Sequence, residues 1–216
     1  MTYKPKAFVY VIESPSDIDL LDGRTEGRSL CEALKLAEIP HAYTLITTKN
    51  ALKVSLKERL IETLEKYPNQ SPVLHLSMHG NNEGISLTDT AFIKWSELRE
   101  ILAPLTNGME GGLLICMSSC NGSAGLSMAM HEDKDHPFWA LVGNTQTTVW
   151  ADAAIAYITF YHWFFKGGTV KECVERMRAA SGDENFISQY GQSIKQDWAA
   201  FMAATRRQVL IAALRS

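Results

Sequence analysis

The ten residues LLICMSSCNG, at positions 113–122, place an unbroken apolar run directly before a short polar segment. The run from Leu113 to Met117 is typical of a strand that is buried on both faces of a sheet. An earlier segment, VLHLSMHGNN at positions 73–82, has the same design. Each predicted strand therefore ends in a residue that can carry chemistry, His79 in the first and Cys120 in the second.

Apolar runs alternate with helical patterns along the rest of the chain, which predicts an α/β fold with a mostly parallel central sheet flanked by helices. The expected strands are Ala7–Ile12, Ala42–Thr47, Val73–Met78, Leu113–Met117 and Trp139–Gly143, with a small hairpin over Ile85–Trp95. The expected helices are one that carries Leu30, Ala33, Leu34 and Ala37 on one face, then Ala51–Lys66, Ser96–Leu102, a helix from about Ser123, Asp152–Lys166 and Val170–Ala180. We find no linker, so we expect a single domain over residues 1–216 with a helical segment from about 184.

Polar residues at the starts of these helices are expected to cap them. Asn50, Ser96 and Asp152 each stand where an N-cap would stand. Thr169 is followed three residues later by Glu172, and this spacing predicts a capping box.

Composition excludes several classes of protein. The 216 residues are 46% hydrophobic and 21% charged, and a folded chain of this size buries about 70% of its surface. The net charge of −3, without a basic stripe, argues against a nucleic-acid partner. The apolar stretch Val149 to Phe165 is interrupted by polar residues, so no membrane span is expected. The amino-terminus lacks a signal-peptide core, so we expect a cytoplasmic protein.

The two strand ends predict a nucleophilic site. Ligands bind outside the carboxyl ends of parallel strands, so His79 and Cys120 meet in one crevice if their strands are neighbours. An adjacent imidazole and the start of a helix near Ser123 would both favour the thiolate of Cys120. Glycines at 80 and 122 would let backbone N–H groups approach a carbonyl oxygen.

The other cysteines and histidines have simpler interpretations. Cys116 lies inside an apolar strand and is expected to fill the core, and His75 is expected to be a hydrogen-bonded core histidine. A zinc site built from Cys116, Cys120, His131 and His136 is disfavoured, because a Cys2His2 finger needs both thiols on a tight turn. No metal or other cofactor is expected. A final group of aromatic residues is expected to pack helices: Trp150, Tyr157, Phe160 and Tyr161.

Three segments together resemble a known family: LHLSMHG, LLICMSSCNG and ALVGNTQTTVWADAAIAYITFYHWFFKGGTVKECVERM. Residues 7–180 are similar to the caspase-like cysteine peptidases, in particular the bacterial CHAT-type group related to caspases and separase. The resemblance implies a single caspase-like (caspase-hemoglobinase) domain. It also implies that His79 is the catalytic histidine, that Cys120 is the nucleophile, and that the backbone N–H groups of Gly80 and Cys120 form the oxyanion hole. The implied reaction is peptide-bond hydrolysis through an acyl-enzyme.

The specificity positions depart from the family pattern. Ser118 stands two residues before the cysteine, where metacaspase-like enzymes have an acid and caspases have Gln. Arg24 and Arg28 lie in the region where aspartate-specific caspases carry a pocket arginine. Asp152 is an alternative pocket acid that would bind Arg or Lys. These positions are consistent with a preference for an acidic, a basic or an apolar substrate residue before the scissile bond.

The sequence therefore predicts a cysteine endopeptidase that acts on a protein substrate and responds to a separate activator protein. The resemblance further implies a role in bacterial antiviral defence or cell death. The alternative is a catalytically silent module that keeps the caspase fold and serves as a scaffold or interaction partner. An intact His79 and Cys120 favour the enzyme.

Overall fold

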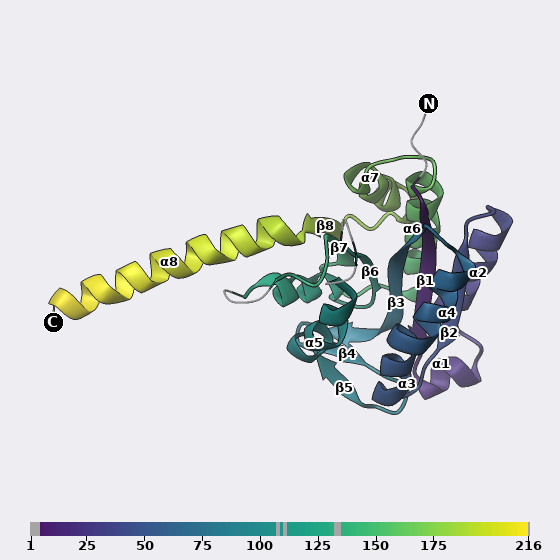
Figure 1. The fold of residues 1–216 in the computed structure, drawn as a ribbon, viewed down its shortest axis with the longest axis horizontal. Helices are drawn as coiled ribbons and strands as arrows, with labels where there is room; N and C mark the ends of the chain where they lie inside the picture. The colour runs from purple at the N-terminus through teal and green to yellow at the C-terminus, as the bar shows by residue number, and fades with distance from the viewer. Residues whose placement is uncertain (1–4, 107–108, 110–111, 132–134, 216) are drawn as a thin grey trace.

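The protein is a three-layer α/β structure in which helices cover both faces of a twisted sheet (Figure 1). The computed structural model describes residues 5–106, 109, 112–131 and 135–215. Six strands form the main sheet in the order β2-β1-β3-β6-β7-β8. The first five are parallel and β8 runs antiparallel to β7. The predicted mostly parallel α/β fold is confirmed.

The strands are β1 (Ala7–Ser14), β2 (His41–Leu45), β3 (Ser71–Asn81), β4 (Gly84–Ser86), β5 (Phe92–Lys94), β6 (Leu114–Ser118), β7 (Ala140–Asn144) and β8 (Phe186–Tyr190). Strand β3 is longer than its neighbours, and its last three residues pair with β4. Together with β5, β4 forms the expected small hairpin, which branches from the carboxyl edge of the sheet.

The helices are α1 (Asp17–Leu21), α2 (Glu26–Leu36), α3 (Lys49–Val54), α4 (Leu60–Lys66), α5 (Trp95–Thr106), α6 (Trp150–Phe164), α7 (Val170–Ser181) and α8 (Gly191–Arg215). A π-helical turn, Ser55–Arg59, joins α3 to α4, and a 3-10 helix, Gly122–Ala129, follows β6. No helix in the described part of the chain combines the length and the apolar character needed to cross a bilayer.

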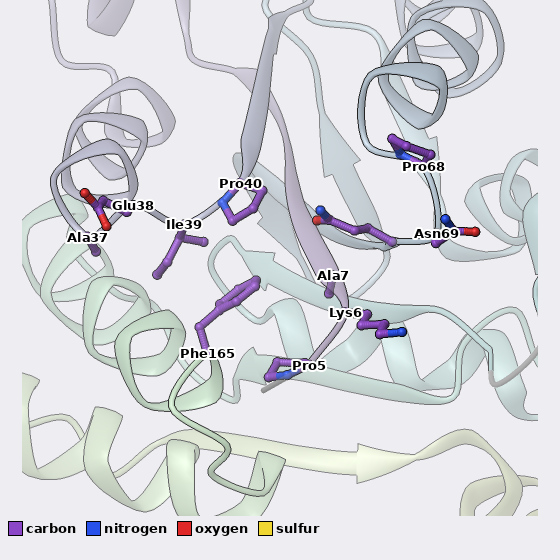
Figure 2. A pocket seen from close by; sticks show the side chains of 11 residues that line it. Pro5, Lys6, Ala7, Ala37, Glu38, Ile39, Pro40, Pro68, Asn69 and Phe165 are labelled. Carbon is purple, nitrogen blue, oxygen red and sulfur yellow. The ribbon is translucent and has the colours of Figure 1, made fainter. Parts of the chain in front are cut away.

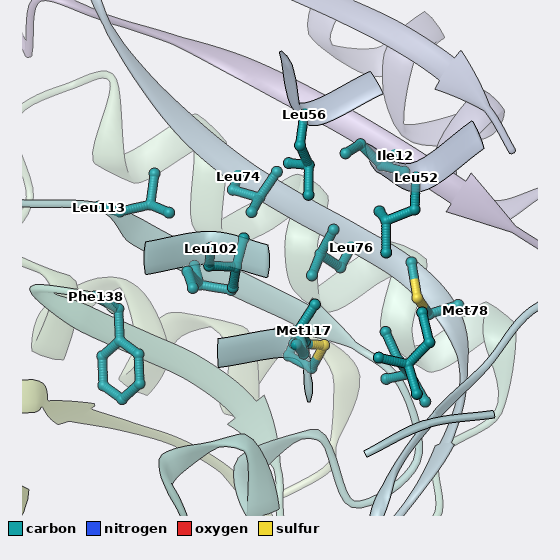
Figure 3. Close-up of a cluster of buried hydrophobic side chains, with 14 of the residues drawn as sticks. Ile12, Leu52, Leu56, Leu74, Leu76, Met78, Leu102, Leu113, Met117 and Phe138 are labelled. Carbon is teal, nitrogen blue, oxygen red and sulfur yellow. The ribbon is translucent and has the colours of Figure 1, made fainter. Parts of the chain in front are cut away.

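Each face of the sheet has its own apolar core. Alternate residues of a strand point to opposite faces, so strands covered on both sides are apolar at nearly every position. One core packs β3 and β6 against α3, α4 and α5 and includes Leu76, Leu102 and Met117 (Figure 3). The other packs the reverse face against α2, α6 and α7 and includes Leu30 and Tyr157.

Two elements were not predicted. The segment expected to be helical from about 184 begins with strand β8, whose backbone completes the edge of β7 before α8 starts. The loop after β1 contains the short helix α1, which Ser16 caps by accepting a hydrogen bond from the Asp19 N–H at 3.0 Å. Strand β8 depends on hydrogen bonds with β7, and α1 depends on its cap, Ser16. Neither segment has the apolar periodicity that predicts an element from sequence.

Three of the expected caps are wrong. Thr48, and not Asn50, caps α3 by accepting from the Ala51 N–H. Helix α5 already includes Ser96, and α6 begins at Trp150, so Asp152 lies in its first turn. Each of the three expected caps therefore lies inside its helix. The capping box of Thr169 and Glu172 is confirmed.

Ile115 offers a test of the first core, since its side chain is fully buried in the central strand β6. Ile115→Ala should lower the free energy of unfolding by about 2–5 kcal/mol, because it leaves a cavity that the neighbouring side chains cannot fill. The matched change Ile61→Ala, at a half-exposed helix position, should alter it by less than about 0.5 kcal/mol. Urea unfolding measures both, and equal effects would contradict this assignment of the core.

Candidate active site

The site lies at the carboxyl edge of the sheet, where β3 and β6 end side by side. The two strands pair in parallel with Ser77 opposite Ser118. His79 and Cys120 each follow this pair by two residues, so they leave the sheet at the same level. His79 belongs to the extension of β3 and pairs with Ser86 of β4, which holds its backbone beyond the main sheet.

The backbone of Gly80 packs directly against the loop that carries Cys120. A Cβ atom placed on Gly80 would lie 3.1 Å from the Cys120 carbonyl oxygen and 3.1 Å from Ser119 Oγ. Glycine is therefore the residue that lets the two strand ends approach this closely. The structure brings together the two segments that the sequence singled out.

The turn after Cys120 is held close to the sheet. Asn121 adopts a left-handed conformation with φ 52°, and its N–H donates to the Gln146 carbonyl at 2.9 Å. A Cβ atom on Gly122 would lie 2.7 Å from the Met117 carbonyl oxygen, and one on Gly143 would lie 2.7 Å from Gly122. Glycines at 122 and 143 thus allow the loop to lie against β6 and β7.

The thiol of Cys120 is partly exposed, and its Sγ lies 3.7 Å from the carbonyl oxygen of Thr148. Thr148 belongs to the loop that leads from β7 into α6. The thiol therefore faces the start of α6, on the same side as Trp150, whose ring meets the His79 ring edge to face at 5.3 Å.

His79 is held by a carboxylate that the sequence did not single out. Its Nε2 lies 2.9 Å from Oδ2 of Asp19, on α1. A carboxylate can only accept hydrogen bonds, so Nε2 carries a hydrogen atom and donates a hydrogen bond to Asp19. Nδ1 is then the nitrogen that can take up or release a proton. The His79 side chain is 45% exposed, which leaves it accessible to a substrate.

Asp19 is itself oriented by its neighbours. Burial alone would raise the pKa of this carboxyl, but the hydrogen bonds from Ser16 and His79 and the charges of His79 and Arg24 outweigh it and hold the pKa below its usual range. The Ser16 hydroxyl donates to Oδ2 at 2.6 Å, and Arg24 Nε lies 3.1 Å from Oδ1. Asp19 therefore stays ionised at neutral pH. The one sequence signal for it is its place, three residues after a capping serine, in the loop after β1.

The predicted specificity residues are dispersed around this centre. Ser118 is buried in β6, and Arg24 is tied to Asp19 and to Asp22 at 3.0 Å. Arg28 is exposed in the first turns of α2. Asp152 follows Trp150 by two residues of helix, so its side chain leaves α6 about 200° away from the side that contacts His79.

The remaining cysteines are core residues. Burial raises the pKa of Cys31, Cys116 and Cys173 to about 12 in each case, so these thiols stay protonated at neutral pH. Cys116 points from β6 into the core beside Tyr161, whereas a zinc finger would need it on a turn. Within the described residues, no three His, Cys, Asp or Glu side chains gather closely enough to bind a metal.

The sequence also predicts a core position for His75 and a helix-packing role for four aromatic residues. His75 is fully buried and bonds to the Tyr161 hydroxyl at 3.0 Å, so the prediction of a core histidine is confirmed. Tyr157, Phe160 and Tyr161 pack between α6 and the sheet as expected. Trp150 contacts the His79 ring, and the sequence did not predict that contact.

A hollow of about 480 Å³ lies at the opposite edge of the sheet, near the start of β1 (Figure 2). Pro5, Pro40 and Phe165 surround it, together with backbone turns. None of the candidate catalytic or specificity residues lines it. The candidate catalytic residues His79 and Cys120 lie at the carboxyl edge instead, where an open parallel sheet binds its ligands.

Comparison with solved structures gives the fold a class. A secreted C11 cysteine protease from Bacteroides thetaiotaomicron, solved with an irreversible peptide inhibitor, superposes with a TM-score of 0.59 at 10% identity, over 93% of this chain and 69% of that one. The Arg-specific cysteine proteinase gingipain R matches with a TM-score of 0.47 at 10% identity, over 83% of this chain and 44% of that one.

This chain has the caspase-like fold, which it shares with the C11 protease. No protein-family profile matches the sequence, and no curated protein sequence does either. The likeness is therefore one of fold, and a sequence identity of 10% does not assign a reaction to this site.

The thiols provide a direct test of the site. Iodoacetamide should modify one cysteine per folded chain, Cys120, because the other three are buried and protonated. All four should react in denaturant. Peptide mapping by mass spectrometry identifies the modified residue. Rapid native labelling of Cys31, Cys116 or Cys173 would contradict the described burial.

Proposed function

We propose that this protein is a cysteine endopeptidase in which Cys120 is the nucleophile and His79 the proton carrier. The observation that supports this most is the contact of His79 with Asp19 at 2.9 Å, next to Gly80, whose backbone packs against the Cys120 loop. A nucleophile, a base on the neighbouring strand and a carboxylate that orients the base are the three parts of a nucleophilic hydrolase site.

In the first half of the reaction, the Cys120 thiolate attacks the scissile carbonyl carbon and forms a C–S bond. Nδ1 of the His79 imidazolium gives its proton to the amide nitrogen as the C–N bond breaks, and the amine leaves. In the second half, neutral His79 removes a proton from water, which attacks the thioester. The C–S bond breaks, a carboxylic acid is released, and the thiolate and imidazolium are restored.

Asp19 acts as a positioning residue throughout. Its ionised carboxylate keeps the proton on Nε2 and presents Nδ1 for transfer. It also stabilises the imidazolium, because an opposite charge at hydrogen-bond distance favours the charged form. The lowered pKa of Asp19 means that this support persists at mildly acidic pH.

The backbone N–H groups of Gly80 and Cys120 are proposed to bind the oxyanion. The close packing of Gly80 against the Cys120 loop supports this role, since donors from two segments must converge on one oxygen. Removing one such donor typically costs about 3–4 kcal/mol of transition-state stabilisation.

For the substrate side chain before the scissile bond, we propose a polar, uncharged pocket floor formed by Ser77 and Ser118. These two serines pair across β3 and β6 next to the Cys120 loop, and both are buried. Within the described residues, neither hydroxyl has a hydrogen-bond partner. A substrate group that reached them would satisfy both. Arg24 supports Asp19 instead of binding the substrate side chain.

The wider role is proposed from the family resemblance. The substrate would be a protein, the activator a separate protein, and the setting a CHAT-type defence or cell-death system in the cytoplasm. Neither nucleic acid nor a membrane is part of this proposal.

Single substitutions test the dyad. Cys120→Ala and His79→Ala should each reduce cleavage of fluorescent casein by at least about 10³-fold. The reason is that removing either the nucleophile or the base loses most of the rate that the two provide together. Labelling by a peptidyl acyloxymethyl ketone should be lost in the same variants, and this readout does not require a known substrate.

Cys116→Ala is the matched control, because it removes a buried thiol from β6, the strand that leads to Cys120. It should lower the melting temperature and leave labelling at Cys120 intact. Normal cleavage by Cys120→Ala, or labelling that follows Cys116, would refute the proposed mechanism.

Asp19→Asn tests the positioning role. The amide keeps the shape of the side chain but lacks the charge that stabilises the imidazolium, so kcat should fall by about 10²-fold or more. The basic limb of the pH profile should move to lower pH, because a neutral amide does not stabilise the imidazolium as a carboxylate does. Asp22→Asn, which removes a more exposed acid that also pairs with Arg24, is the control. A drop in kcat with an unmoved basic limb would show that Asp19 has only a structural role.

A further inference from the structure

The loop that joins β7 to α6, residues 145–149, contacts the turn that carries Cys120. Two of its backbone carbonyl oxygens make these contacts. The Gln146 carbonyl accepts a hydrogen bond from the Asn121 N–H at 2.9 Å. The Thr148 carbonyl lies 3.7 Å from Cys120 Sγ. One contact acts on the backbone directly after the cysteine and the other on the thiol itself, so the position of the nucleophile depends on how firmly this loop is held.

Asn144, the last residue of β7, sets the conformation at the start of the loop. Its side chain is fully buried, and its Oδ1 accepts a hydrogen bond from the Gln146 N–H at 2.8 Å. A bond of this kind, from a side chain to the backbone two residues on, closes a tight Asx turn. On the other side of the amide group, Nδ2 donates to Oδ2 of Asp183 at 2.6 Å. The carboxylate fixes which way the Asn144 amide faces, because a reversed amide would place its NH2 group against the Gln146 N–H.

Asp183 lies in the turn between α7 and β8 and is itself firmly held. Its second oxygen, Oδ1, accepts hydrogen bonds from the backbone N–H and the Nδ2 of Asn185, at 2.9 Å and 2.8 Å. Burial alone would raise the pKa of this carboxyl, but the hydrogen bonds from Asn185 and Asn144 help to outweigh it and hold the pKa below its usual range. Asp183 therefore stays ionised at neutral pH. Its bond to Asn144 is charge-assisted, and such bonds are stronger than those between neutral groups.

Backbone hydrogen bonds hold the same two segments together without the carboxylate. Asn144 pairs with Phe186 in the ladder between β7 and β8. The next residue, Thr145, donates its N–H to the Asn185 carbonyl at 3.0 Å. Loss of the Asp183 carboxylate should therefore leave β7 and β8 paired and affect mainly the loop that follows.

We propose that Asp183 is a positioning residue that holds the Cys120 turn through Asn144. The series of hydrogen bonds runs from its carboxylate to the Asn144 side chain, and then through the backbone of Gln146 to the Asn121 N–H. Asn121 is left-handed at φ 52°, a conformation that fixed neighbours maintain. Without the carboxylate, the Asn144 amide can turn and the loop loosens. The thiolate then spends less time in the position from which it attacks.

Reciprocal substitutions test the bond between Asp183 and Asn144. Asp183→Asn places two NH2 groups against each other, and Asn144→Asp places two carboxylates there, so each single variant should break the bond. The double variant restores one amide and one carboxylate in exchanged positions. Each single variant should lower the maximal rate of Cys120 labelling by the peptidyl acyloxymethyl ketone by about tenfold or more, and the double variant should recover most of it.

Two further measurements separate positioning from binding and from a general loss of charge. The ketone concentration that gives half the maximal rate should change much less than the rate, because Asp183 acts on the nucleophile and not on the bound inhibitor. Glu184→Gln is the matched control, since it removes the neighbouring acid of the same turn, which is exposed. This variant should label at the wild-type rate.

Hydrogen exchange gives a readout that does not require activity. In Asp183→Asn, the Asn121 N–H should exchange at least about tenfold faster, because its acceptor is on the loosened loop. The N–H groups of β6, in the middle of the main sheet, should keep their protection. Loss of protection in β6 as well, without recovery in the double variant, would show that the bond serves stability alone and would overturn the proposal.

The inference rests on the proposed role of Cys120, and the two can fail separately. Single variants that label at the wild-type rate would overturn the positioning role and leave the proposed peptidase intact. Slower labelling with unchanged exchange at Asn121 would also overturn it, because the effect would then not pass through the loop. A wild-type protein that the ketone does not label at Cys120 would refute the proposed function, and the positioning role with it.

Discussion

The parallel pairing of β3 with β6 is the constraint on which the candidate active site depends. The register of Ser77 with Ser118 determines that His79 and Cys120 leave the sheet at the same level. Backbone hydrogen bonds hold that register, and a shift by one residue would exchange the side chains that β3 or β6 gives to the two cores. Glycines at 80, 122 and 143 then let the two strand ends pack closely, because a Cβ atom at any of them would meet backbone or side-chain atoms at 3.1 Å or less.

The sheet keeps its structural and its chemical side chains apart. Along the middle of β3 and β6, alternate residues fill two dry cores, and even the histidine and cysteine found there, His75 and Cys116, are fully buried. Beyond the last ladder pair, the same residue types are partly exposed as His79 and Cys120. Burial raises the pKa of the Cys116 thiol to about 12 and makes it inert. Position along the strand therefore decides which cysteine can react.

Helix α1 shows how a small local element completes such a site. Ser16 begins the helix and also donates to Asp19, so the cap and the orientation of the carboxylate share one hydroxyl. Arg24 occupies the other carboxylate oxygen. With both of its oxygens engaged, Asp19 presents a fixed acceptor to His79, as a positioning group must.

The sequence by itself determined the α/β class, five of the six strands of the main sheet, and the two polar strand ends with His79 and Cys120. These features follow from apolar periodicity, which is local and survives in a single sequence. Only the tertiary structure decided the contact of Asp19 with His79, the contact of Trp150 with His79, strand β8 and the exposure of α8. Each of these depends on residues distant in the chain: Asp19 and His79 are 60 positions apart, and β8 is a strand because β7 supplies its hydrogen bonds. Periodicity reports which face of an element is apolar, but it does not identify the element that covers that face.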